Sequence, residues 1–229
     1  MISIAMPTYE SFGRGHEFLE FQFQKFLKQT YKDFEVVISD HSKNDDIEAL
    51  CNEYIPRLDI NYMRNEENRG NFTDNTNRAM RRCKGDIIKV LFQDDFLWDK
   101  HSLEKINDAF VDGTMWLVTS CEHTHDGINF HRLHRPRYNE KIYTGNNTIG
   151  NPSVLSVRRC DDMLFFDERM IWTVDIDYYK RLHDKYGPPL ILDEVTVAIR
   201  LWDKQMTHLI SPRIKQIEVE RSIRKHEQT

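Results

Sequence analysis

The chain contains 229 residues, of which 39% are hydrophobic and 30% are charged, and its formal net charge is −5. A chain of this size forms one large domain or two halves that share a core. The acidic balance argues against a general polyanion-binding protein, no apolar run approaches the ~18 residues of a membrane span, and we expect no signal peptide. The four cysteines are scattered without a CxxC pair, which predicts reduced thiols and a cytoplasmic location.

Short apolar runs alternate with amphipathic segments through the first hundred residues. Hydrophobic residues at helical spacing predict helices that end near Gln29, span 47–55 and follow an N-cap at Asn71. The apolar runs between them predict strands over 2–6, 34–39, 60–63 and 86–92. Strands that alternate with helices predict βαβ units, right-handed crossovers and an α/β fold with a mostly parallel sheet.

The pattern is looser after residue 96. Helices are expected over 102–110, 175–186 and from Pro212 onward, and strands over 116–120, 152–157 and 195–201. The segment 121–147 is mostly polar and rich in histidine and arginine. We therefore divide the chain into a domain over 1–211, with halves 1–96 and 97–211, and a helical tail over 212–229.

Asp94 and Asp95 follow the run 86–92, which we expect to be a buried central strand. Two adjacent acids have no place inside a buried strand, so they belong at its carboxyl end. Open α/β sheets bind ligands at this edge. The pair therefore indicates either a site for a divalent cation and a phosphate-bearing substrate or a solvated turn before the next helix.

Three common phosphate and metal motifs do not fit. A dinucleotide fingerprint would place its glycines directly after the first strand, but Gly13 and Gly15 come later and Phe18 occupies the third glycine position. The P-loop pattern is absent. A calcium-binding EF-hand loop that began at Asp94 would lack its glycine and its final glutamate.

Four stretches together resemble the inverting glycosyltransferases of family 2, which have the GT-A fold. The stretches cover roughly residues 1–110 and are Pro7-Thr-Tyr-Glu10, Gln29 to Asp40, Asn68-Arg-Gly-Asn71, and Lys84-Gly-Asp86 leading to Gln93-Asp-Asp95. The resemblance implies a donor site for a nucleotide-sugar, with a uridine diphosphate sugar as the expected donor, and a Mn²⁺ or Mg²⁺ cofactor.

The resemblance also implies roles for individual residues in the donor half. Asp40 would lie at the base edge, Asp94 near the ribose, and Asp95 on the metal. Asp40 is equally consistent with ordinary helix-start chemistry. The other residues that we assign to substrate binding are Pro7, Thr8, Tyr9 and Glu10 around the nucleoside, Asn68, Arg69 and Asn71 before the third helix, and Arg200 near the diphosphate.

The acceptor half matches the family less closely. Family members carry an acidic pair before a helix, and its second acid is the catalytic base; here Val174 replaces the first acid and Asp175 is the second. Asp175 is also a candidate helix cap, whereas Asp177 is turned about 200° away on the helix. In the family, a histidine often follows the arginine that corresponds to Arg200, but Trp202 stands at that place here. His208 lies nearby in the sequence and is the candidate for a third metal ligand.

These observations predict a metal-dependent inverting glycosyltransferase. The acceptor stays open among a glycan or polysaccharide, a lipid-linked glycan, a protein and a small metabolite. The basic segment around Arg132, Arg135 and Arg137 could bind a phosphate backbone, which adds a hydroxyl-bearing modified base in DNA to the candidate acceptors. The simpler interpretation of this segment is a solvated loop that folds over the donor. A non-catalytic nucleotide-sugar binder is the alternative of another class, although such a binder has no use for a base at Asp175.

Overall fold

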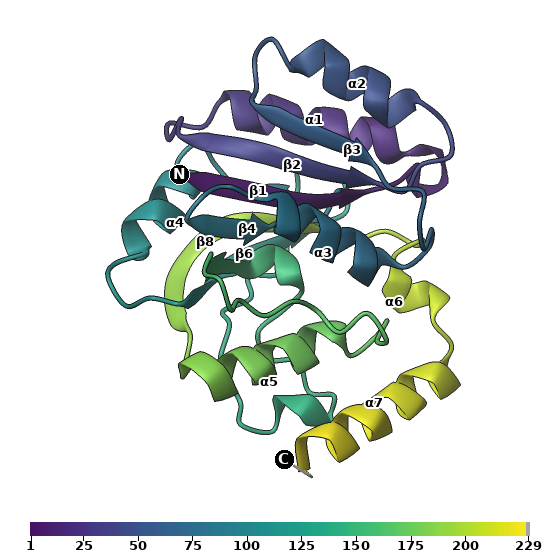
Figure 1. Cartoon of the computed structure of the whole chain (residues 1–229), viewed down its shortest axis with the longest axis vertical. Coiled ribbons are helices and arrows are strands. Elements are labelled where there is room, and N and C mark those ends of the chain that lie inside the picture. Colours follow the sequence, from purple (N-terminus) through teal and green to yellow (C-terminus); the bar gives the residue numbers. More distant parts are fainter. Residues whose placement is uncertain (228–229) are drawn as a thin grey trace.

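A computed structural model describes residues 1–227 and contains one eight-stranded sheet with helices on both faces (Figure 1). The strand order across the sheet is β3-β2-β1-β4-β7-β6-β8-β5. The strands are β1 (Ile2–Thr8), β2 (Phe34–Asp40), β3 (Ile60–Arg64), β4 (Ile87–Val90), β5 (Phe96–Leu97), β6 (Trp116–Thr124), β7 (Leu155–Arg158) and β8 (Leu190–Arg200). The helices are α1 (Gly15–Leu27), α2 (Asp46–Tyr54), α3 (Phe72–Arg82), α4 (Ser102–Ala109), α5 (Val174–Tyr186), α6 (Met206–Leu209) and α7 (Pro212–Glu227).

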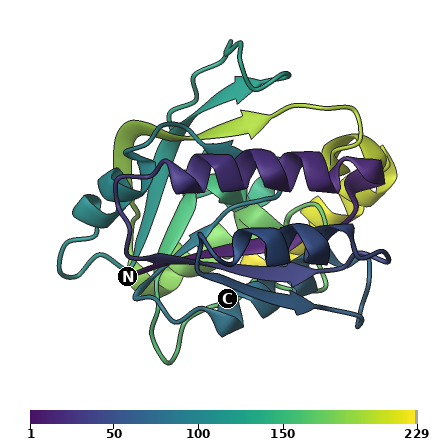
Figure 2. The ribbon, with the colours of Figure 1, turned by 90° about the horizontal axis from the view of Figure 1, so that it is seen from above.

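The strands β3, β2, β1 and β4 are parallel to one another, as the alternation of strands and helices predicts. The chain moves outward from β1 to β2 to β3 and then returns to the other side of β1 as β4. Right-handed crossovers therefore put α1 and α2 on one face and α3 on the other. Figures 1 and 2 show α1 and α2 side by side over the strands, with α3 beneath them. The strand order reverses between β1 and β4, which is where such sheets bind ligands.

The second half makes the sheet mixed. β7 runs antiparallel to both β4 and β6, β8 runs parallel to β6, and the short strand β5 closes the far edge antiparallel to β8. β6 and β8 are longer than predicted. The extension of β6 over 121–124 pairs with 197–200, and β8 begins five residues earlier, where Leu190, Ile191 and Leu192 pair with the start of β6. The expected strand over 152–157 begins with a 3-10 turn at Pro152–Val154, and β5 and α6 have no counterpart in the prediction.

Lys89 is the exception to the apolar character of the central strand β4. Its side chain is fully buried, and its ammonium group donates to the backbone carbonyls of Ser153 and Leu155. Burial lowers the pKa of this lysine to about 7. The side-chain hydroxyl of Ser153 in turn accepts from the backbone N–H of Phe92, so this buried contact fixes the chain where it leaves β4.

The C-terminal helix α7 packs against the 3-10 turn at Ile142–Thr144, and its Lys225 and His226 bind Asp177 of α5, on the side of the sheet away from α1 and α2 (Figure 1). The predicted tail over 212–229 is thus a helix in contact with the acceptor half, and its last two residues lie outside the described part of the chain. Among the described helices, none is long and apolar enough to cross a membrane.

Candidate active site

A cleft of about 1640 Å³ opens at the carboxyl ends of β1 and β4 and reaches across to α5 and α6. One wall is formed by the segment after β1 and by the segment after β4, at the point where the strand order reverses. Seven of the predicted site residues line this cleft: Pro7, Thr8, Tyr9, Glu10, Arg69, Asp94 and Asp175. Five do not: Asp40, Asn68, Asn71, Asp95 and Arg200.

Gln93 joins the two segments that form this wall. Its side-chain oxygen accepts from the Tyr9 backbone N–H at 3.0 Å and from the Ser11 hydroxyl at 3.1 Å, and its amide donates to the Gly15 carbonyl at 2.8 Å. Ser11 and Phe12 have positive φ angles of 45° and 55°, which are costly for residues other than glycine. The buried amide of Gln93 compensates for this strain and holds Tyr9 at the cleft. We assigned Gln93 no role from the sequence, because an uncharged amide does not stand out as a metal ligand or a catalytic group.

Asp94 and Asp95 face different surroundings. Oδ2 of Asp94 accepts from Nε1 of Trp202 at 2.8 Å, and this side chain reaches the cleft. Asp95 is 1% exposed, and its two oxygens accept from the Arg200 backbone N–H at 3.0 Å and the Asn151 amide at 2.8 Å. Burial raises the pKa of both carboxyl groups, and the neighbouring Asp94 raises that of Asp95 further. We expected both side chains in the site, with Asp95 on the metal, but only the half-buried Asp94 lines the cleft, and Asp95 is buried behind it.

Arg200 does not point its guanidinium into the cleft. The group lies over the rings of Phe18, Phe21 and Phe96 at 5.2–5.3 Å, and its Nε donates to the Asp94 carbonyl at 3.1 Å. Cation–π contacts and a backbone hydrogen bond thus occupy this side chain. We expected Arg200 to contact a diphosphate, but in the structure it supports the segment that carries Asp94.

Asp40 is likewise held inside the protein. It is fully buried; one oxygen accepts from the Thr8 hydroxyl and from the backbone and side chain of Ser42, and the other accepts from the Tyr62 hydroxyl at 2.9 Å. A carboxylate with its lone pairs already used has little capacity to accept from a base. Asp40 does not cap a helix either, because it is the last residue of β2 and Asp45 is the N-cap of α2. Its carboxylate holds the turn after β2, and the cleft is lined here by His41 and Lys43 instead.

The segment before α3 supplies one cleft residue and two structural ones. Arg69 lines the cleft. Asn71 is the N-cap of α3, as predicted, because its side-chain oxygen accepts from the N–H groups of Thr73 and Asp74. Asn68 adopts a positive φ of 52° and donates to Asp74 at 3.4 Å. Neither asparagine faces the cleft, and both shape the turn that presents Arg69.

Asp175 lies on the opposite wall, as the second residue of α5. The N-cap position belongs to Thr173, so Asp175 does not occupy the capping site that its alternative interpretation requires. Oδ2 of Asp175 accepts from the Asn147 amide at 2.6 Å, and Oδ1 accepts from the backbone N–H of Ile176 at 2.8 Å. Burial raises the pKa of this carboxyl group to about 6, which suits a base that works near neutral pH.

Residues 3–168 match the family described as Glycosyl transferase family 2, which is well over half of the chain. The chain is a family 2 glycosyltransferase. The resemblance found in the strand-end motifs is thereby confirmed. No curated protein matches the sequence.

Solved structures confirm the GT-A fold of this glycosyltransferase. Residues 1–349 of TarS from S. aureus align with a TM-score of 0.67 at 18% identity, covering 87% of this chain and 60% of that one. The same protein in complex with UDP-GlcNAc gives 0.68 at 16% identity, with coverages of 95% and 66%. The mannosyltransferase PcManGT from Pyrobaculum calidifontis, in complex with GDP-Man and Mn²⁺, gives 0.71 at 15% identity, with coverages of 100% and 64%. The chain thus spans less than two thirds of these neighbours.

Four carboxylate residues line the glycosyltransferase cleft, namely Glu10, Asp94, Asp175 and Asp203, and Asp94 is the one that follows the central strand. Within residues 1–227, no group of three or more His, Cys, Asp or Glu side chains is placed to hold a metal ion. Mg²⁺ and Mn²⁺ are nevertheless commonly held by one or two carboxylates together with substrate phosphates and water. Asp94 fits that mode because its carboxylate reaches the cleft and only Oδ2 is engaged, by Trp202 and, at 3.5 Å, by Gln205. His208 also lines the cleft, on α6.

The segment 121–147 of this glycosyltransferase lies partly against the cleft. Backbone bridges join Cys121 to His134 and Thr124 to Phe130, so the end of β6 and the returning chain form a ribbon. Of the three arginines in the basic stretch, only Arg132 lines the cleft, whereas Arg135 pairs with Asp193 at 2.8 Å. The cleft residues of this ribbon are Cys121, His123, His125, Arg132 and His134.

Proposed function

We propose that this protein is a metal-dependent inverting glycosyltransferase that moves a sugar from a nucleotide-sugar, with a UDP-sugar as the first candidate, to a hydroxyl of a glycan acceptor. The observation that carries the proposal is that Asp94 and Asp175 come from opposite halves of the chain and line one cleft. Asp94 follows the central strand at the ligand-binding edge of the sheet. Asp175 is a half-buried carboxylate on the other half of the chain, with a pKa matched to proton transfer.

The donor is assigned to the β1–β4 side. Tyr9 is 39% exposed and offers a ring for a nucleoside, and Arg69 and Lys43 offer positive charge for phosphates. Asp94 would hold the cation, which when bound stabilises the negative charge of the leaving nucleoside diphosphate. Gln93 contributes by fixing the relative positions of Tyr9 and the Asp94 segment.

The acceptor is assigned to the side of Asp175. Its carboxylate takes the proton of the acceptor hydroxyl while that oxygen forms a bond to the anomeric carbon. The bond between the anomeric carbon and the diphosphate oxygen breaks, and its electron pair leaves on the diphosphate. Attack opposite the leaving group inverts the anomeric centre. Asn147 and the Ile176 N–H each hold one oxygen of Asp175, which orients the carboxylate for this transfer.

Three histidines of the ribbon favour a hydroxyl-rich acceptor over DNA. His123, His125 and His134 each use one ring nitrogen on a backbone carbonyl, at 2.8, 3.0 and 3.0 Å. A carbonyl oxygen only accepts, so that nitrogen carries the hydrogen, and in a neutral ring the other nitrogen is a lone-pair acceptor. Burial lowers the pKa of His123, which favours its neutral form. Such nitrogens accept hydrogen bonds from sugar hydroxyls, whereas phosphates offer them no donor.

A screen of nucleotide-sugars by thermal shift, with and without Mn²⁺, tests the donor assignment. We expect one donor class to raise the melting temperature only when the cation is present. Hydrolysis of that donor in the absence of acceptor, followed by transfer to a panel of glycans, separates an enzyme from a non-catalytic binder. A chain that binds a donor but neither hydrolyses nor transfers it would contradict the proposal.

A further inference from the structure

The buried glutamate of the C-terminal helix, Glu218, binds the turn that leads into α5. Glu218 is 5% exposed, and its carboxylate accepts from the backbone N–H groups of Ile171 at 2.9 Å, Trp172 at 2.7 Å and Thr173 at 3.0 Å. It also accepts from the Thr173 hydroxyl at 3.3 Å. Four donors thus converge on one carboxylate that comes from 45 to 47 residues further along the chain.

This contact supplies what the start of α5 lacks locally. Thr173 occupies the N-cap position but makes no side-chain capping hydrogen bond, because its hydroxyl is turned toward Glu218 and Met170. Buried N–H groups without a partner are costly, and negative charge is favourable near a helix N-terminus. The Glu218 carboxylate meets both requirements. Asp175 stands two residues after Thr173, so the contact determines where Asp175 is placed.

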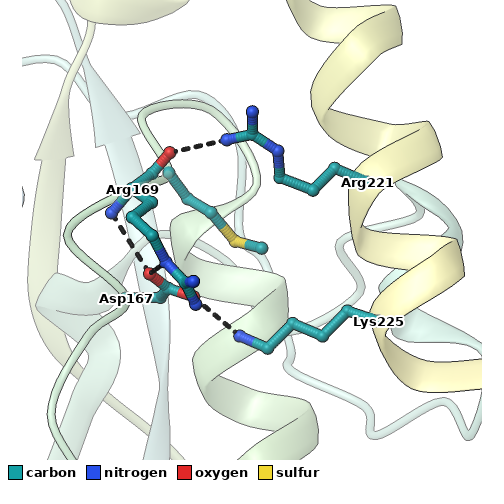
Figure 3. Close-up of a pocket in the computed structure, with 5 residues that line it drawn as sticks. Asp167, Arg169, Arg221 and Lys225 are labelled. Carbon is teal, nitrogen blue, oxygen red and sulfur yellow. Dashed lines mark hydrogen bonds and ion pairs between the residues drawn. The ribbon is translucent and has the colours of Figure 1, made fainter. Parts of the chain in front are cut away.

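Other contacts of α7 hold Glu218 in place. Lys225 and His226 bind Oδ1 of the buried Asp177 on α5, at 2.7 and 2.9 Å. Lys225 also lines a pocket of about 530 Å³ together with Asp167, Arg169, Met170 and Arg221. Figure 3 shows Lys225 reaching Asp167 and Arg221 donating to the Arg169 carbonyl in this pocket. The helix α7 is therefore fixed both to α5 and to the segment that precedes it.

We infer that Glu218 is a positioning residue for the catalytic base: it holds the turn 171–173 so that Asp175 faces the acceptor, and α7 is thereby part of the catalytic apparatus. This inference rests on the proposed role of Asp175. Misplacement of a reacting group by about 1 Å can cost about 100-fold in rate. Loss of Glu218 should therefore act on the chemical step and leave the donor side unchanged, because donor contacts are assigned to the other half of the cleft.

The test compares Glu218→Ala and Glu218→Gln with the matched control Glu220→Gln. Glu220 is exposed on the same helix, and its side chain accepts a hydrogen bond from Gln216. We expect Glu218→Ala to lower kcat at least ~10-fold while the KM for the donor stays within about twofold. Glu218→Gln keeps an acceptor oxygen and should recover part of the rate. Glu220→Gln should transfer sugar at the parental rate.

Amide hydrogen exchange provides a readout that does not depend on activity. Faster exchange at Ile171, Trp172 and Thr173 in either Glu218 variant would show that Glu218 holds this turn, whether or not the parent protein transfers sugar, so a failure of the proposed function is distinguished from a failure of the inference. Unchanged protection at these amides overturns it. A parental kcat in a folded Glu218 variant also overturns it, as does a loss of rate explained wholly by a smaller folded fraction. If Glu218→Ala does not fold, Glu218→Gln decides between these outcomes.

Discussion

The indole N–H of Trp202 donates a 2.8 Å hydrogen bond to Oδ2 of Asp94, the carboxylate that reaches the cleft. Trp202 stands where many family 2 enzymes carry a histidine. A histidine nitrogen can bind a cation, whereas an indole N–H can only donate. Trp202 therefore orients Asp94 without adding a ligand, and the assigned cation depends on one carboxylate and the substrate phosphates.

The first prediction separates the two adjacent acids. Asp94→Asn should lose most of the cation-dependent binding of a UDP-sugar with little change in melting temperature. Asp95→Asn should instead lose about 1–3 kcal/mol of stability, because its amide would turn a donor toward the Arg200 N–H or the Asn151 amide. Calorimetry of the UDP-sugar with Mn²⁺ and then with excess chelator measures donor binding, and thermal unfolding measures stability. Donor affinity that is unchanged by chelation would remove the metal from the proposal.

The second prediction concerns the base. Asp175→Asn keeps the shape of the side chain and should bind metal and donor within a few-fold of the parent, but it should transfer sugar at least about 100-fold more slowly. The matched control is Asp184→Asn, which lies exposed on the same helix and pairs with Lys180. Single-turnover transfer rates measure the difference. Transfer by Asp175→Asn at the parental rate would place the base elsewhere.

The third prediction is the pH dependence of transfer. Burial raises the pKa of Asp175 to about 6, and the base acts only when ionised. The transfer rate should therefore rise tenfold per pH unit below about 6 and level off above it, whereas an aspartate at its ordinary pKa would already be saturated near pH 5. A profile of kcat/KM between pH 4.5 and about 8 tests this. In Asp175→Asn, the same step should vanish from the residual rate.

The fourth prediction addresses nucleic acid. Because only Arg132 of the three arginines lines the cleft and Arg135 is paired with Asp193, we expect no tight binding of duplex DNA. A gel shift at low salt, with Arg132, Arg135 and Arg137 reversed together as the comparison, is the measurement. Binding that falls steeply with salt and disappears in the triple variant would restore a modified base to the acceptor candidates.

Hydrophobic periodicity was enough to predict the parallel half of the sheet and the position of its ligand-binding edge. The runs that become β1, β2 and β4 are almost wholly buried, and their periodicity differs clearly from that of the helices between them. The antiparallel placement of β7 was not predictable, because pairing direction depends on contacts that are distant in sequence. The buried Lys89 also breaks the apolar pattern, and only the carbonyl groups of another segment compensate for it.

For the site, the segments were predictable but the orientation of individual side chains was not. Asp94 and Asp95 are chemically identical neighbours, and the contacts of Trp202 and Asn151 decide which one faces the cleft. Arg200 ends β8, and the aromatic rings that take up its guanidinium come from α1 and β5. Glu218 lies in a helix without a motif, and its importance is apparent only from contacts with residues far away in sequence.

Asp177 is the last prediction, because the structure changes the role that we expected for it. We expected it only to point away from Asp175, but it is fully buried and bound by Arg181, Lys225 and His226, so it joins α5 to α7. Breaking such a buried network leaves its cations uncompensated, and Asp177→Asn should cost about 3 kcal/mol of folding free energy.

The stabilisation by Asp177 should depend on pH, because these partners hold the pKa of Asp177 down to about 2, despite burial. The folded pKa lies below the unfolded value near 3.9, so this stabilisation is present above about pH 4 and is lost as the pH falls toward 2. Urea unfolding of the parent and of Asp177→Asn at pH 7 and near pH 3 measures it, and a difference that does not shrink in acid would contradict the ionic origin.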